Sequence, residues 1–150
     1  MTEHHKLMEL MFDEAMRLRD EDDLTGARGL LVQIIERAAS NDKVLLGHSH
    51  MQLGYIAQLR GEPAPREFHF QQAVMILPAS DLASVSLYST LFVAGRFREA
   101  FAEMVRLLRL RYSRKYDEMM GEPGFGDELI GELRELFLEA RRLIAKRRLN

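Results

Sequence analysis

Apolar residues recur at intervals of three and four positions along almost the whole of this 150-residue chain. That spacing places them on one face of an α-helix, whereas the strict alternation typical of a half-buried strand occurs nowhere over a useful length. The sequence therefore predicts an all-α protein of about seven helices. We expect these helices at about residues 7–18, 24–38, 44–59, 65–77, 81–95, 97–112 and 127–148.

Proline, glycine and capping residues separate the predicted helices. Pro65 suits the first turn of the fourth helix, because its missing N–H would have no helical partner there. Ser80 or Asp81 can cap the fifth helix. The glycine-rich segment 121–126 is the clearest loop in the chain, and Asp127 directly behind it is expected to cap the last helix.

The composition is that of an ordinary soluble globular protein, with 47% hydrophobic residues, 29% charged residues and a net charge of −2. The length favours a single domain over residues 1–150. The chain has no cysteine, which excludes disulfides, thiol nucleophiles and cysteine metal sites. Its polar start lacks the apolar block of a signal peptide and no apolar stretch reaches membrane-spanning length, so we expect a cytoplasmic protein with no membrane contact.

One window of 34 residues, 47–80, carries small, aromatic and turn residues in a regular order. The pattern consists of Leu53, Gly54, Gly61, Phe70, Ala73 and Pro78. It resembles a tetratricopeptide repeat, a pair of antiparallel helices that stacks on neighbouring pairs. His50, Ala57 and Arg66 depart from the family pattern, because they stand where tryptophan, tyrosine and a small residue are usual.

Two other windows fit the same pattern less fully. The later one keeps Gly95 and Ala100, but Tyr88 stands at an expected glycine, so we expect the two helices there to pack less closely. The earlier one has Asp22 in place of the turn glycine. The resemblance thus implies a degenerate repeat at 8–41, repeats at 47–80 and 81–114, and a capping helix at 127–148.

A fold of this family implies a short right-handed superhelix whose concave side is lined by the first helix of each pair. The lysines and asparagines with which chaperone-binding members of the family hold a terminal carboxylate are absent from those positions. The surface is instead apolar and rich in methionine, which suits an apolar helix or strand of a partner, although single residues of the set can equally belong to the core. The implied partner-binding residues are Phe12, Met16, Arg19, His48, Met51, Tyr55, Gln58, Leu82, Val85, Ser89 and Phe92.

The expected function is therefore that of a non-enzymatic protein-binding module, an adaptor or chaperone that serves another protein or peptide, with no cofactor. An immunity protein that neutralises a cognate bacterial toxin is the alternative, by analogy with other small, acidic helical proteins. Self-association into a homo-oligomer through the groove or an uncapped end is a third possibility. Nucleic acid is disfavoured, because the basic stretch 96–115 has no aromatic platform and is typical of a solvated helix face.

The segment KVLLGHSHMQLG, residues 43–54, offers the one candidate for catalysis. A short apolar run leads into Gly47-His48-Ser49, as a strand leads into the turn that presents a nucleophilic serine in some hydrolases. Met51 replaces the second glycine that this turn needs, and no other strand is predicted, so a serine hydrolase is disfavoured and Ser49 is interpreted as structural.

The histidines do not form a metal-binding pattern. His48 and His50 lie two positions apart, so on a helix they point in nearly opposite directions and cannot share a metal ion. His69 stands alone in the sequence, and His4 and His5 lie at a terminus. No metal site is predicted.

Overall fold

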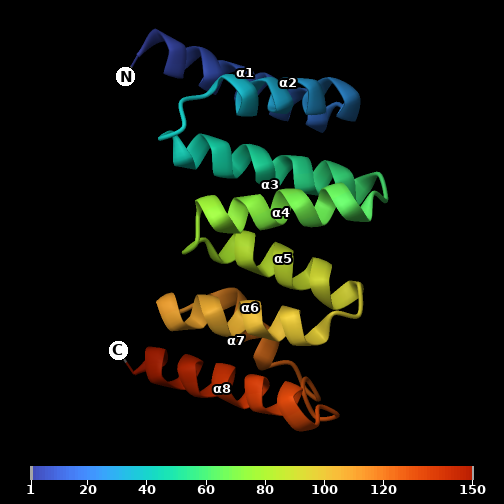
Figure 1. The fold of residues 1–150 in the computed structure, drawn as a ribbon, viewed down its shortest axis with the longest axis vertical. Helices are drawn as coiled ribbons and strands as arrows, with labels where there is room; N and C mark the ends of the chain where they lie inside the picture. The colour runs from blue at the N-terminus through green and yellow to red at the C-terminus, as the bar shows by residue number, and fades with distance from the viewer. Residues whose placement is uncertain (1, 150) are drawn as a thin grey trace. The chain divides into compact units, whose positions relative to one another are not determined.

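The computed structural model describes residues 2–149, and these form eight α-helices and no strand (Figure 1). The all-α prediction is confirmed. None of the described helices is long and apolar enough to cross a membrane. The helices are α1 (Glu3–Asp20), α2 (Leu24–Arg37), α3 (Lys43–Leu59), α4 (Pro63–Ile76), α5 (Asp81–Val93), α6 (Phe97–Leu110), α7 (Arg114–Met120) and α8 (Gly131–Arg148).

The structure has one helix more than the roughly seven predicted, because a short helix, α7, follows the sixth. Helix α6 ends where Arg111 takes up an extended backbone, with φ −162°. Ser113 then starts α7, since its hydroxyl accepts a hydrogen bond from the backbone N–H of Tyr116 at 3.2 Å.

The last helix also starts later than expected. It begins at Gly131 rather than at Asp127, and Ile130 occupies the N-cap position without a side-chain hydrogen bond. The backbone N–H of Asp127 instead bonds to the carbonyl of Gly124 in a turn, at 3.2 Å. Gly124 and Gly126 both have positive φ, so the chain turns there and cannot yet be helical.

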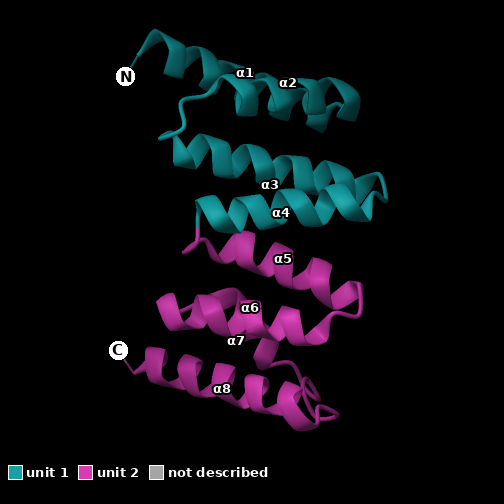
Figure 2. Cartoon of the chain, viewed as in Figure 1, with its two compact units in different colours: residues 1–77 teal, residues 78–150 magenta. Residues whose placement is uncertain are grey.

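The chain divides into two compact units, residues 1–77 and 78–150 (Figure 2). Unit 1 contains the hairpins α1–α2 and α3–α4, with α2 packed against α3. Unit 2 contains the hairpin α5–α6, with α7 packed against α5 and α8 against α6. The helices thus pair as α1–α2, α3–α4 and α5–α6, and α8 packs against α6. The division into repeats and a capping helix stays a prediction. A single domain and a right-handed superhelix across both units stay predictions.

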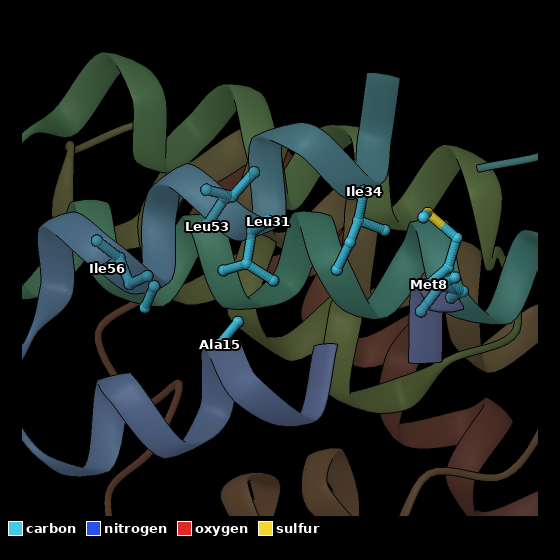
Figure 3. Packing of buried hydrophobic residues seen from close by; sticks show 8 residues of the cluster. Met8, Ala15, Leu31, Ile34, Leu53 and Ile56 are labelled. Atoms are coloured by element: carbon cyan, nitrogen blue, oxygen red, sulfur yellow. The ribbon is translucent and has the colours of Figure 1, made fainter. Parts of the chain in front are cut away.

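The core of unit 1 joins its first three helices (Figure 3). Buried side chains from α1, α2 and α3 meet there: Met8, Ala15, Leu31, Ile34, Leu53 and Ile56. The approach of α3 to α4 depends on Gly54, because a Cβ atom at this position would lie 2.4 Å from Cε1 of Phe70. The close packing that the repeat pattern predicts at Gly54 is therefore confirmed.

The hairpin turns also follow the pattern. Gly61 and Gly95 have φ values of 66° and 79°, in the left-handed region that favours glycine. Asp22, which stands at the equivalent place of the degenerate first repeat, adopts the same conformation with a φ of 66°. The first turn is thus built like the others, with an aspartate accepting the strain that glycine avoids.

Unit 2 has an aromatic core. Tyr88 of α5 is 4% exposed and packs edge-on against Phe101 of α6 and Tyr116 of α7. A ring thus lies where the repeat pattern has glycine, and α5 contacts α6 less extensively than α3 contacts α4, as expected. Burial raises the pKa of Tyr88 to about 12, so the phenol is neutral at any physiological pH.

Candidate functional site

A hollow in unit 1 lies between α1 and the start of α3 and has a volume of about 590 Å³. Both helices line it with a mixture of apolar and ionisable side chains. They are His5, Glu9, Phe12, Asp13, Asp42, Val44, Leu45 and His48, and we call this set the α1–α3 groove.

Helical spacing explains how α1 brings its four residues together. Residues 5, 9 and 13 are spaced four apart and residue 12 lies three after residue 9, so all four lie on one side of the helix. Phe12 is half-buried and packs against the core of unit 1, while Glu9 and Asp13 are exposed beside it. One face of α1 thus contributes an apolar floor and an acidic rim.

Helix α3 completes the groove with its first turns. Leu45 is buried, whereas Val44 next to it is 61% exposed, which leaves an apolar side chain open to solvent at the edge of the groove. His48 lies one turn further along the same face and is exposed. Asp42 precedes the helix at its N-cap position but makes no capping hydrogen bond to it.

The carboxylate of Asp42 faces α1 instead. Its Oδ2 lies 2.6 Å from Nδ1 of His5, and the other ring nitrogen of His5 lies 3.1 Å from Oε1 of Glu9. A protonated His5 donates to both acids at once, which ties the start of α1 to the start of α3. Asp13 makes no hydrogen bond or ion pair that the structure shows within residues 2–149, so its charge is available to a ligand.

Two of the predicted partner-binding residues, Phe12 and His48, line this groove. Arg19 lies beyond it and donates a 2.6 Å hydrogen bond from Nη1 to Gln52, which links α1 to α3. Tyr55 packs edge-on against Phe70, with ring centroids 5.3 Å apart.

The remaining predicted residues differ in exposure. Met51 is 4% exposed and belongs to the core of unit 1, so it is closed to a partner. Met16, Val85 and Ser89 are half-buried, while Gln58, Leu82 and Phe92 are exposed. The set falls in two units, and a shared concave surface stays a prediction. The methionine-rich surface is reduced in unit 1, because one of its two methionines lies inside.

No protein-family model, curated protein or solved structure matches this chain. The resemblance to tetratricopeptide repeats therefore rests on the residues that carry it and on the helix pairs described above. Function has to be argued from the sites themselves.

Ser49 lies in the middle of α3 and not at a turn after a strand. Its side chain is completely buried, and its hydroxyl has no hydrogen-bond partner in the described part of the chain. The geometry of a nucleophile elbow, an exposed serine on a sharp turn, is therefore missing at this position.

The sequence suggested that His69 stands alone, but in the structure it pairs with His50. Their Nδ1 atoms lie 3.0 Å apart across the α3–α4 hairpin, and the edge of Phe68 packs against both rings. Burial lowers the pKa of His50. Burial, His50 and the charge of Arg28 together lower the pKa of His69 to about 4, so both rings are neutral near pH 7.

The histidine pair joins two helices, and it gives no sign of being a metal centre. Among residues 2–149, no group of three or more histidine, aspartate or glutamate side chains is placed to hold a metal ion. With both rings neutral, one Nδ1–H donates to the unprotonated Nδ1 of the other ring. This hydrogen bond needs one unprotonated Nδ1 as its acceptor, so it is lost when both rings are protonated.

Proposed function

We propose that this protein is a non-enzymatic protein-binding module that holds a segment of a partner polypeptide in the α1–α3 groove. The observation that carries the proposal is the composition of the groove: an apolar floor at Phe12 and Leu45, an exposed Val44, and carboxylates along the rim. Apolar area supplies affinity, and charged groups around it select and orient the partner.

The charges define the kind of segment that fits. Glu9, Asp13 and Asp42 bring three negative charges to the groove, against the titratable His5 and His48. A partner segment with a lysine or arginine next to an apolar residue complements both features. A free carboxylate does not, which agrees with the absence of the lysines and asparagines that the carboxylate-binding members of the resembled family use.

The frame around the groove supports such a role. Helices α1, α2 and α3 are held by one core, and the starts of α1 and α3 are tied through His5 and Asp42 at 2.6 Å. A groove on rigid helices is formed before the partner arrives, so binding costs little ordering of the protein itself.

The test is binding of the full chain to an array of peptides that vary in charge and apolar content. We expect basic, apolar peptides to bind and acidic ones not to bind. Val44→Glu and Asp13→Lys should each weaken binding at least tenfold, because one charges the apolar edge and the other repels the cation. Matched controls at exposed positions outside the groove, Val93→Glu and Glu36→Lys, should leave it unchanged.

The same variants separate the two roles considered. Binding of many basic, apolar peptides indicates an adaptor or chaperone, whereas one folded enzyme that is bound and inhibited indicates an immunity protein. In either case Val44→Glu and Asp13→Lys must weaken the complex. Equal affinity for these variants and for the original chain contradicts the proposal.

A further inference from the structure

A second hollow, separate from the groove, lies within unit 2. It has a volume of about 440 Å³ and is formed by α5, α6 and the loop between α7 and α8. Three phenylalanines and one leucine contribute its apolar side chains: Phe92, Phe101, Phe125 and Leu129. We call it the phenylalanine hollow.

The three rings come from three different elements and meet at steep angles. Phe101 of α6 is the central one, 1% exposed. Its ring centroid lies 6.4 Å from that of Phe92, at 75°, and 6.3 Å from that of Phe125, at 48°. Rings arranged in this way are not stacked face to face on one another, so more than one aromatic surface borders the same small volume.

The loop that borders the hollow packs against Phe137 of α8. Gly126 has a φ of 88°, and a Cβ atom there would lie 2.4 Å from Cζ of Phe137. Phe125 packs against the same ring, with centroids 5.7 Å apart. The loop therefore presses on the aromatic core of unit 2, and Phe125 is held against that core rather than left in solvent.

Two carboxylates, Asp127 and Glu128, line the hollow beside the rings. Both are exposed, and the structure shows neither of them in an ion pair or a side-chain hydrogen bond anywhere in residues 2–149. A Cβ atom at Gly124, which also lines the hollow, would lie 3.8 Å from Oδ2 of Asp127.

Aromatic rings with adjacent negative charge are the surroundings that an organic cation prefers. The electron-rich ring faces attract the positive charge, and the apolar rings accept the alkyl groups around it. The same aromatic core already receives one cation of the chain itself, since the guanidinium carbon of Arg141 lies 5.8 Å from the ring centroid of Phe137.

We propose that the phenylalanine hollow binds an alkylammonium cation, either the lysine side chain of a polypeptide or a free quaternary amine. The cation lies against the rings of Phe92 and Phe125, and Asp127 and Glu128 balance its charge. This site is independent of the α1–α3 groove and of the function proposed for it.

The direct test uses choline and its neutral isostere, 3,3-dimethyl-1-butanol, titrated into the full chain and followed by NMR shifts of the residues around the hollow. We expect choline to bind with a dissociation constant on the order of 1–10 mM, as suits a very small ligand, and the neutral alcohol to bind at least fivefold more weakly. Equal or tighter binding of the alcohol overturns the proposal, since the hollow would then be merely apolar. Absence of binding by either compound overturns it as well.

Variants test the two halves of the site separately. Phe92→Leu keeps an apolar side chain but removes the ring, and should weaken choline binding about threefold to tenfold. Phe97→Leu is the matched control, because Phe97 is similarly exposed and contacts Phe92 but does not line the hollow. Loss of binding in both variants, or in neither, contradicts the assignment.

The charge is tested by the double variant Asp127→Asn and Glu128→Gln, which should remove the preference for choline over the alcohol, and by Glu122→Gln as a control in the same loop. The source of the cation is tested with acetylated lysine amide and its N-trimethyl form. Tighter binding of either lysine derivative than of choline indicates a polypeptide ligand, whereas tighter binding of choline indicates a free amine. Retention of full choline selectivity in the double variant refutes the role of the carboxylates.

Discussion

Acidification should destabilise unit 1 through the pair of His50 and His69. The pKa of His69 is lowered from 6.5 to about 4 in the folded protein, by burial first and by the charges of His50 and Arg28 after it. A lowered pKa means that folding favours the neutral ring. The contribution of the neutral His69 ring to the stability of the folded protein is therefore complete above pH 6.5 and is lost as the pH falls from there toward about 4.

The size of the effect follows from linkage. One pKa unit corresponds to about 1.4 kcal/mol, so a ring with a pKa of about 4 when folded and 6.5 when unfolded loses about 2 kcal/mol of stability between pH 7 and pH 5. Solvent around the half-buried ring of His69 screens part of this electrostatic effect, so we expect a loss of about 1 kcal/mol of stability between pH 7 and pH 5. That loss is a measurable fraction of the stability of a unit of this size.

Acid also protonates paired carboxylates, so the comparison must isolate the histidines. We expect the His69→Gln variant to have a lower free energy of unfolding than the original chain at pH 7. Between pH 7 and pH 5, however, its free energy of unfolding should fall by about 1 kcal/mol less than that of the original chain, as measured by urea unfolding. His48→Gln, which removes an exposed histidine of α3, the helix that carries His50, is the matched control and should lose as much stability over this range as the original chain. A direct NMR titration should give His69 a pKa well below 6.5. Equal losses of stability for all three proteins, or a pKa of His69 at or above 6.5, refute the reasoning.

Three substitutions test, in turn, a close helix approach, a strained turn residue and a buried hydrogen bond. Gly54→Ala should destabilise unit 1 by about 2–3 kcal/mol in thermal or urea unfolding, because its Cβ atom would lie 2.4 Å from the ring of Phe70 and something must move; an unchanged midpoint contradicts the close approach. Asp22→Gly should raise stability by up to about 1 kcal/mol, since glycine adopts a φ of 66° without strain, and a loss of stability would show that the aspartate side chain matters more. Ser84→Ala should cost unit 2 about 1–3 kcal/mol, because the hydroxyl donates to buried Glu103 at 2.6 Å; retention of full stability would show that the hydrogen bond is dispensable.

Most of the fold follows from local sequence signals. Apolar spacing predicted seven of the helices within a few residues, and the repeat pattern placed Gly61 and Gly95 at hairpin turns, where both have positive φ. The positive φ of Asp22 was not predicted. The errors lie where the signal is short or ambiguous. Helix α7 is seven residues long and has no amphipathic repeat, and Asp127 looks like a cap until the glycines around it fix a turn.

The candidate sites were predicted less well, because a site depends on contacts between elements. Phe12 of α1 and His48 of α3 were predicted as partner-binding residues from their positions on single helices, and both line the α1–α3 groove. Met51 of α3 was predicted in the same way but is buried, since α3 is covered on most sides. The pairing of His50 with His69 depends on the register of a hairpin. The distances of His50 and His69 from the turn at Gly61 differ by nearly one helical turn, so the sequence alone does not bring the two rings together.

The two hollows share a combination that isolated helix patterns do not reveal. In each, apolar side chains that folding leaves partly exposed, such as Val44 and Phe92, lie beside carboxylates that the described chain does not neutralise, such as Asp13 and Asp127. Neither feature stabilises the protein alone, because exposed apolar surface is left in water and an unpaired charge repels its neighbours. A ligand that is both cationic and apolar relieves both, so the gain from binding arises from groups whose interactions folding left incomplete. Net charge conceals this, since −2 over the whole chain says nothing of where the unpaired acids lie.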